Sequence, residues 1–203
     1  MGAERLNEGE PLQHVLGESW FDGLRIKVNR SVLIPRPETE EVVGALYERI
    51  QPGEDSNLLV VDWCTGSGCV ALALKQRFPK SEVLGWDLSE EAIEVAQINA
   101  RNCNLDVTFE VHDALDAPRL VRPADAVVSN PPYIPRSEAS SMHPRVTQHE
   151  PDMALFVPDD DPLLFYRALE AWCASGNLRP GGWIGLECHT RLASEVAQML
   201  VEH

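Results

Sequence analysis

The chain shows two repeating patterns of apolar and polar residues. Short continuous apolar runs, such as Leu58-Leu59-Val60-Val61, end at turn residues, and this is typical of strands buried in a parallel sheet. Between these runs lie segments whose apolar residues stand three and four positions apart, a spacing that predicts helices. From residue 58 onward the pattern therefore predicts alternating strands and helices. That order favours a parallel sheet with helices on both faces.

The predicted elements follow one another without a long linker or an internal repeat. Strands are expected at 58–63, 82–87, 107–111, 124–129 and 183–188, and helices at 69–78, 90–102, about 162–174 and from about 191 onward. Ser89 suits the N-cap of the second helix, and the Pro-Gly-Gly sequence at 180–182 predicts a turn before the last strand. The segment from 131 to about 158 shows neither pattern and is expected to be irregular.

The first fifty residues have a different pattern. Alternating Leu24, Ile26 and Val28, after the Asp-Gly pair at 22–23, predict a β-hairpin, and a Pro-rich segment then leads into a helix. With 203 residues and 44% hydrophobic content, the chain is expected to form a single globular domain, 1–203. Within it, 1–50 would supply the hairpin and a pocket-closing segment, and 51–203 would form the core.

Charge and cysteine usage exclude several classes of protein. The net charge of −15 argues against a protein that binds nucleic acid mainly through contacts to its phosphates, because such binding needs a basic face. The five cysteines form no Cys-x-x-Cys pair and the six histidines are scattered, so no metal site is expected. No secretory signal and no bilayer-length apolar run is found. These features favour a cytoplasmic protein, or one of an organelle matrix, that does not bind membranes.

A glycine-rich turn, Thr65-Gly66-Ser67-Gly68, follows the first strand of the predicted sheet. Glycine lets the backbone approach a ligand closely, and the next helix offers unpaired N–H groups at its start. Asp87, at the end of the second strand, can accept both hydroxyls of a ribose. Because the pattern Gly-x-Gly-x-x-Gly is absent and Asp62 ends the first strand, a nucleoside methyl donor fits better than a dinucleotide. A tight turn without a ligand, with Asp87 as a helix cap, is the structural alternative.

Asn130-Pro131-Pro132-Tyr133 directly follows the fourth predicted strand. The prolines restrict the backbone and lack an N–H, so carbonyl oxygens remain free to face a ligand. The Asn130 side-chain oxygen and the Pro131 carbonyl can accept both hydrogens of a substrate NH2 group, and Tyr133 offers a surface on which a planar substrate can stack. All four are candidate substrate-binding residues, with Asn130, Pro131 and Tyr133 as candidate catalytic residues. A Pro-Pro turn without function is the alternative.

These motifs resemble those of a known family. Ile-Pro-Arg-Pro-Glu-Thr-Glu at 34–40, Thr-Gly-Ser-Gly at 65–68 and Asn-Pro-Pro-Tyr-Ile-Pro at 130–135 resemble the HemK/PrmC family of protein-glutamine N5-methyltransferases, which modify the Gly-Gly-Gln glutamine of peptide chain release factors. The resemblance covers nearly the whole chain from Gln13 on, including His-Glu-Pro at 149–151. Asn-Pro-Pro-Tyr also occurs in adenine-N6 methyltransferases, so the segment at 35–40 is the more specific one.

The resemblance implies a class I, Rossmann-like α/β fold, S-adenosyl-L-methionine (AdoMet) as methyl donor and a release factor as protein substrate of a monomeric enzyme. Residues 64–68 would line the methionyl part of AdoMet, Asp87 would bind the ribose, and Asp113 and Ala114 would border the adenine. Phe21 and the segment 35–39 would help close the pocket. The residues expected at the cofactor are Phe21, Pro37, Thr39, Asp62, Cys64, Thr65, Gly66, Ser67, Gly68, Asp87, Leu88, Asp113, Ala114 and Asn130.

Three features depart from the family pattern. Cys64 stands where the family usually has glycine, and within residues 1–203 neither the family's N-terminal helical domain nor the antiparallel strand pair usual after the last helix is expected. The strand at 183–188 would then be an exposed sheet edge. Two other functions stay open. An adenine-N6 nucleic-acid methyltransferase shares the Asn-Pro-Pro-Tyr motif, and a non-catalytic AdoMet-binding scaffold is compatible with the departures.

Overall fold

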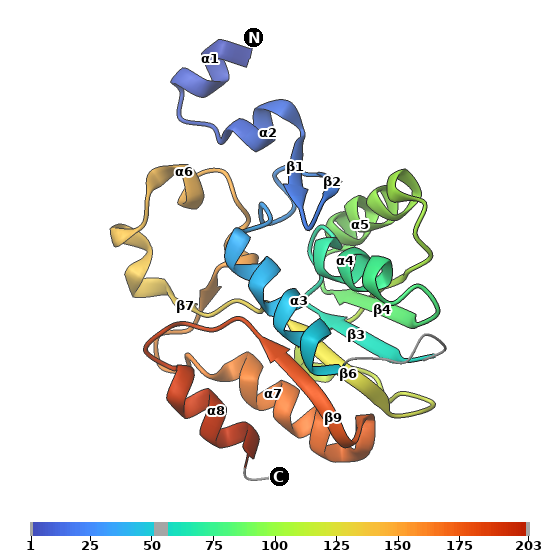
Figure 1. Cartoon of the computed structure of the whole chain (residues 1–203). Coiled ribbons are helices and arrows are strands. Elements are labelled where there is room, and N and C mark those ends of the chain that lie inside the picture. The colour runs from blue at the N-terminus through green and yellow to red at the C-terminus, as the bar shows by residue number, and fades with distance from the viewer. Residues whose placement is uncertain (1, 51–56, 202–203) are drawn as a thin grey trace.

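A computed structural model describes residues 2–50 and 57–201 of the chain, and its centre is a five-stranded parallel sheet (Figure 1). The strand order is β5-β4-β3-β6-β9. The strands are β3 (Leu59–Trp63), β4 (Glu82–Asp87), β5 (Thr108–Val111), β6 (Ala124–Ser129) and β9 (Leu178–Leu186). The predicted parallel sheet is therefore confirmed, and the first four strands lie within one residue of their expected bounds.

The chain starts the sheet in its middle and fills the two sides in turn. From β3 it proceeds outward to β4 and β5, and then returns to the other side of β3 for β6 and β9. Ligands of such sheets bind beyond the carboxyl ends of the strands, where the direction of winding reverses. This arrangement brings the residues that follow β3, β4 and β6 to one edge of the sheet.

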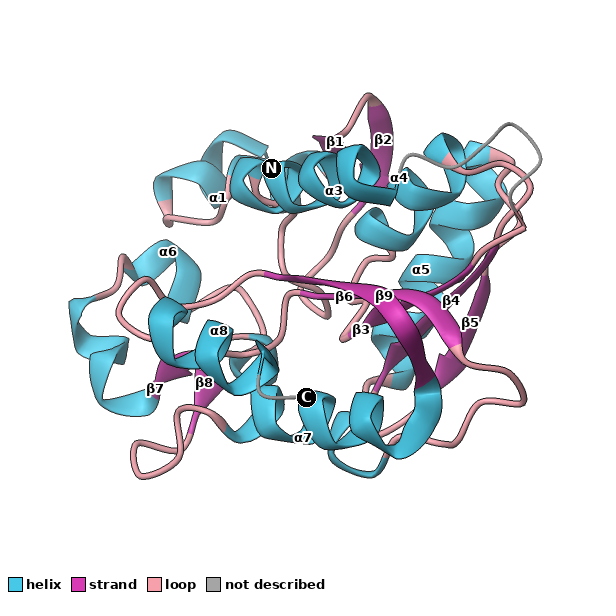
Figure 2. Ribbon diagram, turned by 60° about the horizontal axis from the view of Figure 1, so that its bottom comes forward, coloured by secondary structure: helices cyan, strands magenta, loops and turns pink. Residues whose placement is uncertain are grey.

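Helices cover both faces of the sheet, as predicted (Figure 2). On one face lie α3 (Pro37–Ile50), α4 (Cys69–Arg77) and α5 (Glu90–Cys103), and on the other α7 (Leu164–Trp172) and α8 (Ala193–Val201). Neighbouring residues of β3 point to opposite faces: Val60 packs in the cluster of α3, α4 and α5, whereas Val61 packs against Trp172 of α7. This alternation gives the sheet two apolar cores.

The predicted N-terminal hairpin is present as β1 (Glu18–Phe21) and β2 (Leu24–Lys27). Its turn residues Asp22 and Gly23 both have positive φ, 49° and 78°, as a two-residue hairpin turn requires. The Arg77 guanidinium of α4 donates to both carboxylate oxygens of Asp22, at 2.8 and 2.5 Å. The side chain of Asn99 bonds the backbone N–H and C=O of Lys27 and the carbonyl of Ser67. The hairpin is thus fixed to the glycine-rich turn.

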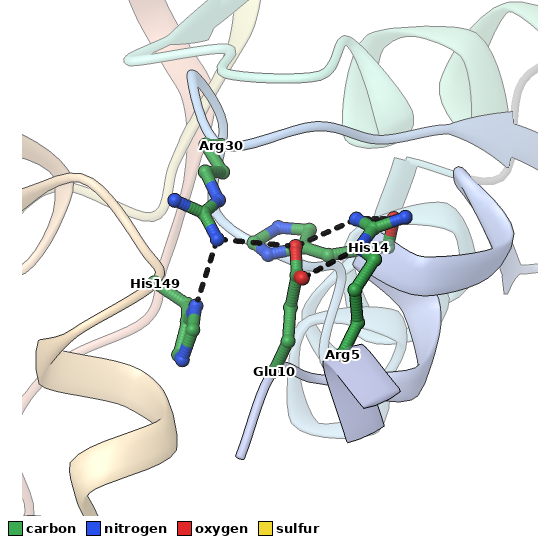
Figure 3. Close-up of polar contacts among 5 residues, drawn as sticks. All are labelled: Arg5, Glu10, His14, Arg30 and His149. Carbon is green, nitrogen blue, oxygen red and sulfur yellow. Dashed lines mark hydrogen bonds and ion pairs between the residues drawn. The ribbon is translucent and has the colours of Figure 1, made fainter. Parts of the chain in front are cut away.

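Two helices before the hairpin were not predicted: α1 (Gly2–Asn7) and α2 (Leu12–Leu16). An ionic cluster connects them to the rest of the molecule (Figure 3). Arg5 donates to both carboxylate oxygens of Glu10 and holds the pKa of that carboxyl down at about 2. Arg30 lies between the Glu10 carboxylate and the His149 ring, 3.4 Å from each. The cluster therefore links α1 to the segment that follows β6.

The segment from 131 to 158, expected to be irregular, is built of very short elements. They are β7 (Ile134–Pro135), η2 (Arg136–Ser141), α6 (Pro144–Thr147), η3 (Asp152–Ala154) and β8 (Phe156–Val157). β7 and β8 pair in parallel and close the segment on itself. Within the described residues, no helix is long and apolar enough to cross a membrane.

The last strand differs from its prediction. β9 begins at Leu178 rather than at residue 183, after the irregular turn η4 (Cys173–Asn177), and it includes the predicted Pro-Gly-Gly turn. The pairing of β9 with β6 shifts in register between Ala124 and Ala126, so the residues of the Pro-Gly-Gly sequence form a bulge in β9. Among the described residues, β9 is the last strand on its side of the sheet. Beyond Leu186, the Glu187 N–H donates to the Ser129 carbonyl at 3.0 Å, which continues the pairing with β6.

Candidate active site

A pocket of about 320 Å³ opens at the carboxyl edge of the sheet, a size in the usual range for small-ligand sites. Its walls come from the ends of β3, β4 and β6, the start of α3, and the segment after β6. The residues expected from sequence that line it are Thr39, Asp62, Cys64, Thr65, Gly66, Ser67, Asp87, Leu88, Asp113, Ala114, Asn130 and Pro132. Most of the expected site thus meets in one cavity.

The turn after β3 is held by a buried carboxyl. Asp62 accepts hydrogen bonds from the Thr65 hydroxyl at 2.6 Å and from the Ala71 N–H of α4 at 3.0 Å. Burial raises the pKa of the Asp62 carboxyl to about 7, although these two hydrogen bonds oppose the rise. Asp62 therefore fixes the turn to the first residues of α4, besides lining the pocket.

Cys64 adopts the left-handed conformation, with φ of 63°, at the point where the chain turns out of β3. This conformation is costly for a residue with a Cβ atom, and it accounts for the glycine that the family usually has here. Burial is the main reason that the pKa of the Cys64 thiol is raised well above its usual range. The thiol therefore stays protonated, and it lines the pocket as a small apolar group.

The two glycines of the turn have different roles. A Cβ atom at Gly66, where φ is 53°, would meet no other atom within 4 Å, so the backbone there is open to a ligand. A Cβ atom at Gly68 would lie only 2.8 Å from the Phe109 ring and 3.0 Å from the Cβ of Ala96. Gly68 does not line the pocket. Its glycine is required by packing rather than by a ligand.

Asp87, at the end of β4, lies directly beside this turn. Its carboxylate accepts hydrogen bonds from the Gly66 N–H at 2.8 Å and from the Ser89 N–H at 3.0 Å. Burial raises the pKa of the carboxyl above its usual value, against the effect of these bonds. A carboxylate can accept about four hydrogen bonds, so capacity remains for the two hydroxyls of a ribose. Ser89 caps α5 as predicted, its hydroxyl accepting from the Ala92 N–H.

Asn130, immediately after β6, is part of a chain of side-chain hydrogen bonds. Its Nδ2 donates to the Thr39 hydroxyl at 3.2 Å, and that hydroxyl donates to the Glu187 carboxylate at 2.5 Å. The Tyr133 hydroxyl donates to the other oxygen of Glu187 at 2.9 Å. Because Nδ2 of Asn130 is engaged by Thr39, Oδ1 is the atom left to accept hydrogen bonds from a ligand in the pocket.

A buried glutamate anchors the Pro-Arg-Pro-Glu-Thr-Glu segment. Glu150 accepts from the Ile34 N–H at 2.9 Å and from the Arg36 guanidinium at 2.5 Å. The side chain of Glu150 is 1% exposed and that of Arg36 32%. This contact joins two segments more than a hundred residues apart that both carried the family resemblance. It holds Arg36 at the pocket wall.

Five expected site residues do not line the pocket. Phe21 is fully buried in the apolar core beneath the hairpin, so its expected place at the pocket is not supported. Pro37 is the first residue of α3 and Pro131 is buried, and neither is among the residues that line the pocket. The Tyr133 hydroxyl is turned to Glu187, and burial and the neighbouring carboxylate raise its pKa well above the usual range. The fifth is Gly68, described above.

Several residues at the site were not expected from sequence. Trp86, Pro151, Met153, Phe156 and Phe165 supply much of the apolar lining. A sequence signal existed for some of them, because His-Glu-Pro at 149–151 belongs to the family resemblance. No periodicity or motif pointed to Glu187, which lies behind Thr39 and contacts the site only through other side chains.

The side chains present suit a nucleoside methyl donor such as AdoMet. The open backbone at Gly66 suits close approach of a ligand, and the Asp87 carboxylate suits a ribose diol. Apolar side chains such as Leu115 and Phe165, beside Asp113 and Ala114, suit a planar base. Among the described residues that line the cavity, the basic side chains are Arg36 and His112. That composition fits the cationic donor better than a pyrophosphate.

Fold and pocket together define a class I AdoMet-dependent methyltransferase. A family model described as a methyltransferase domain matches residues 60–149. A release factor glutamine methyltransferase of Flavobacterium psychrophilum is 39% identical over 98% of this chain and 70% of its own length. One of Bacteroides thetaiotaomicron is 39% identical over 97% of this chain and 69% of its own length. The chain belongs to the release factor glutamine methyltransferase family.

Solved structures show the same fold at low sequence identity. Precorrin 8w decarboxylase of Methanobacterium thermoautotrophicum is 22% identical, with a TM-score of 0.58 over 87% of this chain and 77% of that one. A ribosomal protein L11 methylase of Lactobacillus delbrueckii is 19% identical, with a TM-score of 0.52 over 82% of this chain and 69% of that one. These two likenesses concern the fold alone.

Proposed function

We propose that this chain transfers a methyl group from AdoMet to the side-chain amide nitrogen of a glutamine in a peptide chain release factor, at its Gly-Gly-Gln motif. Family membership supports the activity and the substrate. The observation that carries the chemistry is the orientation of Asn130, whose Nδ2 is bound by Thr39, so that Oδ1 is left for the substrate. An acceptor in that place suits an NH2 group and does not suit a carboxylate.

Catalysis rests on positioning and electrostatics. The nitrogen of an amide is a poor nucleophile because its lone pair is delocalised into the carbonyl. Oδ1 of Asn130 accepts one N–H hydrogen of the substrate amide, which directs the nitrogen lone pair towards the donor and stabilises the positive charge that develops on nitrogen. The carbonyl oxygen of Pro131, the proposed acceptor of the second hydrogen, is next in the chain but does not line the pocket in the free protein. AdoMet, when bound, supplies an electrophilic methyl group on sulfonium. No general base is required before the methyl group is transferred.

The other residues of the pocket divide between donor and substrate. Asp87 accepts the ribose hydroxyls, and the turn at 64–68 borders the methionyl part of the donor. Leu88, Asp113 and Ala114 border the adenine. Pro132 and the apolar side chains of the segment after β6 surround the glutamine. The enzyme acts as a monomer in the cytoplasm. It does not bind nucleic acid directly, in keeping with the net charge of −15.

The proposal is tested by offering labelled AdoMet to a release factor, to DNA and to RNA in parallel. Label is expected in the release factor alone; label in DNA or RNA would favour an adenine-N6 methyltransferase instead. Asn130→Ala is expected to lower transfer by about 100-fold or more, as for loss of one oriented group at a developing charge. Its AdoMet affinity by calorimetry should stay within a few-fold of the original. Asn102→Ala, at an exposed position of α5, is the matched control and should keep full activity.

A further inference from the structure

Glu187 lies at the far end of the hydrogen-bonded chain that reaches Asn130. The carboxylate accepts from two hydroxyls, that of Thr39 at 2.5 Å and that of Tyr133 at 2.9 Å. Thr39 is 4% exposed and lines the pocket, whereas Glu187 is half-buried and does not. Glu187 therefore acts on the pocket through Thr39.

The direction of each hydrogen bond in this chain is set by Glu187. A carboxylate only accepts, so the single hydroxyl proton of Thr39 is committed to it. The Thr39 oxygen can then only accept from Asn130, and the group of Asn130 that can donate is its NH2. Without an acceptor at position 187, the hydroxyl proton of Thr39 is free to turn towards Asn130. The hydroxyl can then either donate to Oδ1 or accept from Nδ2, so both orientations of the Asn130 amide form a hydrogen bond with it.

The position of Glu187 is itself rigid. Its N–H donates to the Ser129 carbonyl at 3.0 Å, one residue before Asn130. Its carbonyl accepts from the hydroxyl of Tyr166, a fully buried residue of α7, at 3.2 Å. Because both backbone groups and both carboxylate oxygens are engaged, the side chain is held in one orientation. This is the arrangement expected of a group that orients another residue.

We infer that Glu187 is a positioning residue that, through Thr39, holds the Asn130 amide with Oδ1 towards the substrate, and so makes the enzyme select glutamine over glutamate. The inference rests on the proposed function. A glutamine NH2 donates to Oδ1, whereas a glutamate carboxylate at the same place would face another acceptor and be repelled. An unfixed Asn130 amide presents its NH2 group part of the time, and that group accommodates a carboxylate.

The test uses Glu187→Met, which keeps the length of the side chain and removes the acceptor. We expect kcat for release factor methylation to fall by about tenfold or more, while AdoMet affinity by calorimetry changes less than about threefold. Binding of the release factor is compared with that of a form whose acceptor glutamine is replaced by glutamate. The original enzyme should prefer the glutamine form, and Glu187→Met should lose most of that preference. Glu195→Met, at an exposed position of α8, is the matched control and should change neither value.

Two changes at Thr39 separate positioning from general damage. Thr39→Ser keeps the hydroxyl and should lose far less of kcat and of the glutamine preference than Thr39→Val does. Thr39→Val removes the hydroxyl and should match Glu187→Met, and the double variant should be no worse than either single one, because both changes break the same chain. Additive losses in the double variant, or unchanged kcat and preference in Glu187→Met, would overturn the inference.

A spectroscopic measurement keeps this test separate from the proposed function. In a ¹⁵N–¹H spectrum of the free enzyme, the side-chain amide of Asn130 is assigned by its loss in Asn130→Ala. We expect its resonances to shift, and its exchange with water to accelerate, in Glu187→Met but not in Glu195→Met. If no release factor is methylated but these changes occur, the proposed function fails and the positioning by Glu187 stands. An unchanged Asn130 amide contradicts the positioning whatever the substrate is.

Discussion

Cys64 provides a sharp test of the backbone geometry at the pocket, because its φ of 63° is unfavourable for any residue with a Cβ atom. The left-handed conformation costs about 1–2 kcal/mol for such a residue. Glycine avoids this cost but loses about 0.5–1 kcal/mol more in backbone entropy on folding. The difference predicts that Cys64→Gly is more stable than Cys64→Ala by about 0.5–1 kcal/mol. Because both variants lack the thiol, its loss does not contribute to the difference between their free energies of unfolding.

The measurement is urea unfolding of both variants, with the free energies of unfolding compared through their midpoints at a common slope. Gln97, at an exposed position within α5 (Glu90–Cys103), supplies the control pair. There the order should reverse, with Gln97→Ala more stable than Gln97→Gly by about 1 kcal/mol. If Cys64→Ala is as stable as Cys64→Gly, or more stable, the left-handed conformation at this position is refuted.

Two further predictions concern buried carboxyls. Glu150→Ala leaves the buried Ile34 N–H without its acceptor, which should lower the free energy of unfolding by about 1–3 kcal/mol; Asp152→Ala, which breaks an exposed ion pair, should cost less than about 1 kcal/mol in the same urea titration. Asp62, whose pKa is about 7 in the folded state and 3.8 as its ordinary value, keeps a proton that the unfolded chain releases. Stability should therefore fall as the pH rises from about 4 to about 7, by at most about 1.4 kcal/mol for each pH unit. Unfolding of Asp62→Asn across this range should lack that part of the fall, and an unchanged profile would contradict the raised pKa.

The sequence predicted the sheet well because its signals are local. Each apolar run of the core ends at a polar or glycine residue, so the ends of β3, β4 and β6 could be located within one residue, and with them Asp62, Asp87 and Asn130. Parallel strands place such ends at one edge of the sheet. The cavity at this edge follows from that arrangement.

Other features depend on contacts between distant segments and had no local signal. Phe21 was expected at the pocket from the resemblance, but the hairpin turns its side chain into the core. Glu187 follows β9, a strand whose start was displaced by a bulge, and its contact with Thr39 spans 148 residues. No local pattern indicates such a partner. The helices α1 and α2 were missed because they are only six and five residues long, too short to show a helical repeat of apolar residues.

The proposed activity of the pocket is methylation of a release factor glutamine on its amide nitrogen. Its most direct test is mass spectrometry of a release factor incubated with this chain and AdoMet, with fragmentation of the peptide that contains the Gly-Gly-Gln motif. We expect one added methyl group on the glutamine side chain with the original enzyme and none with Asn130→Ala. An unmodified glutamine, or a methyl group on another residue, would contradict it.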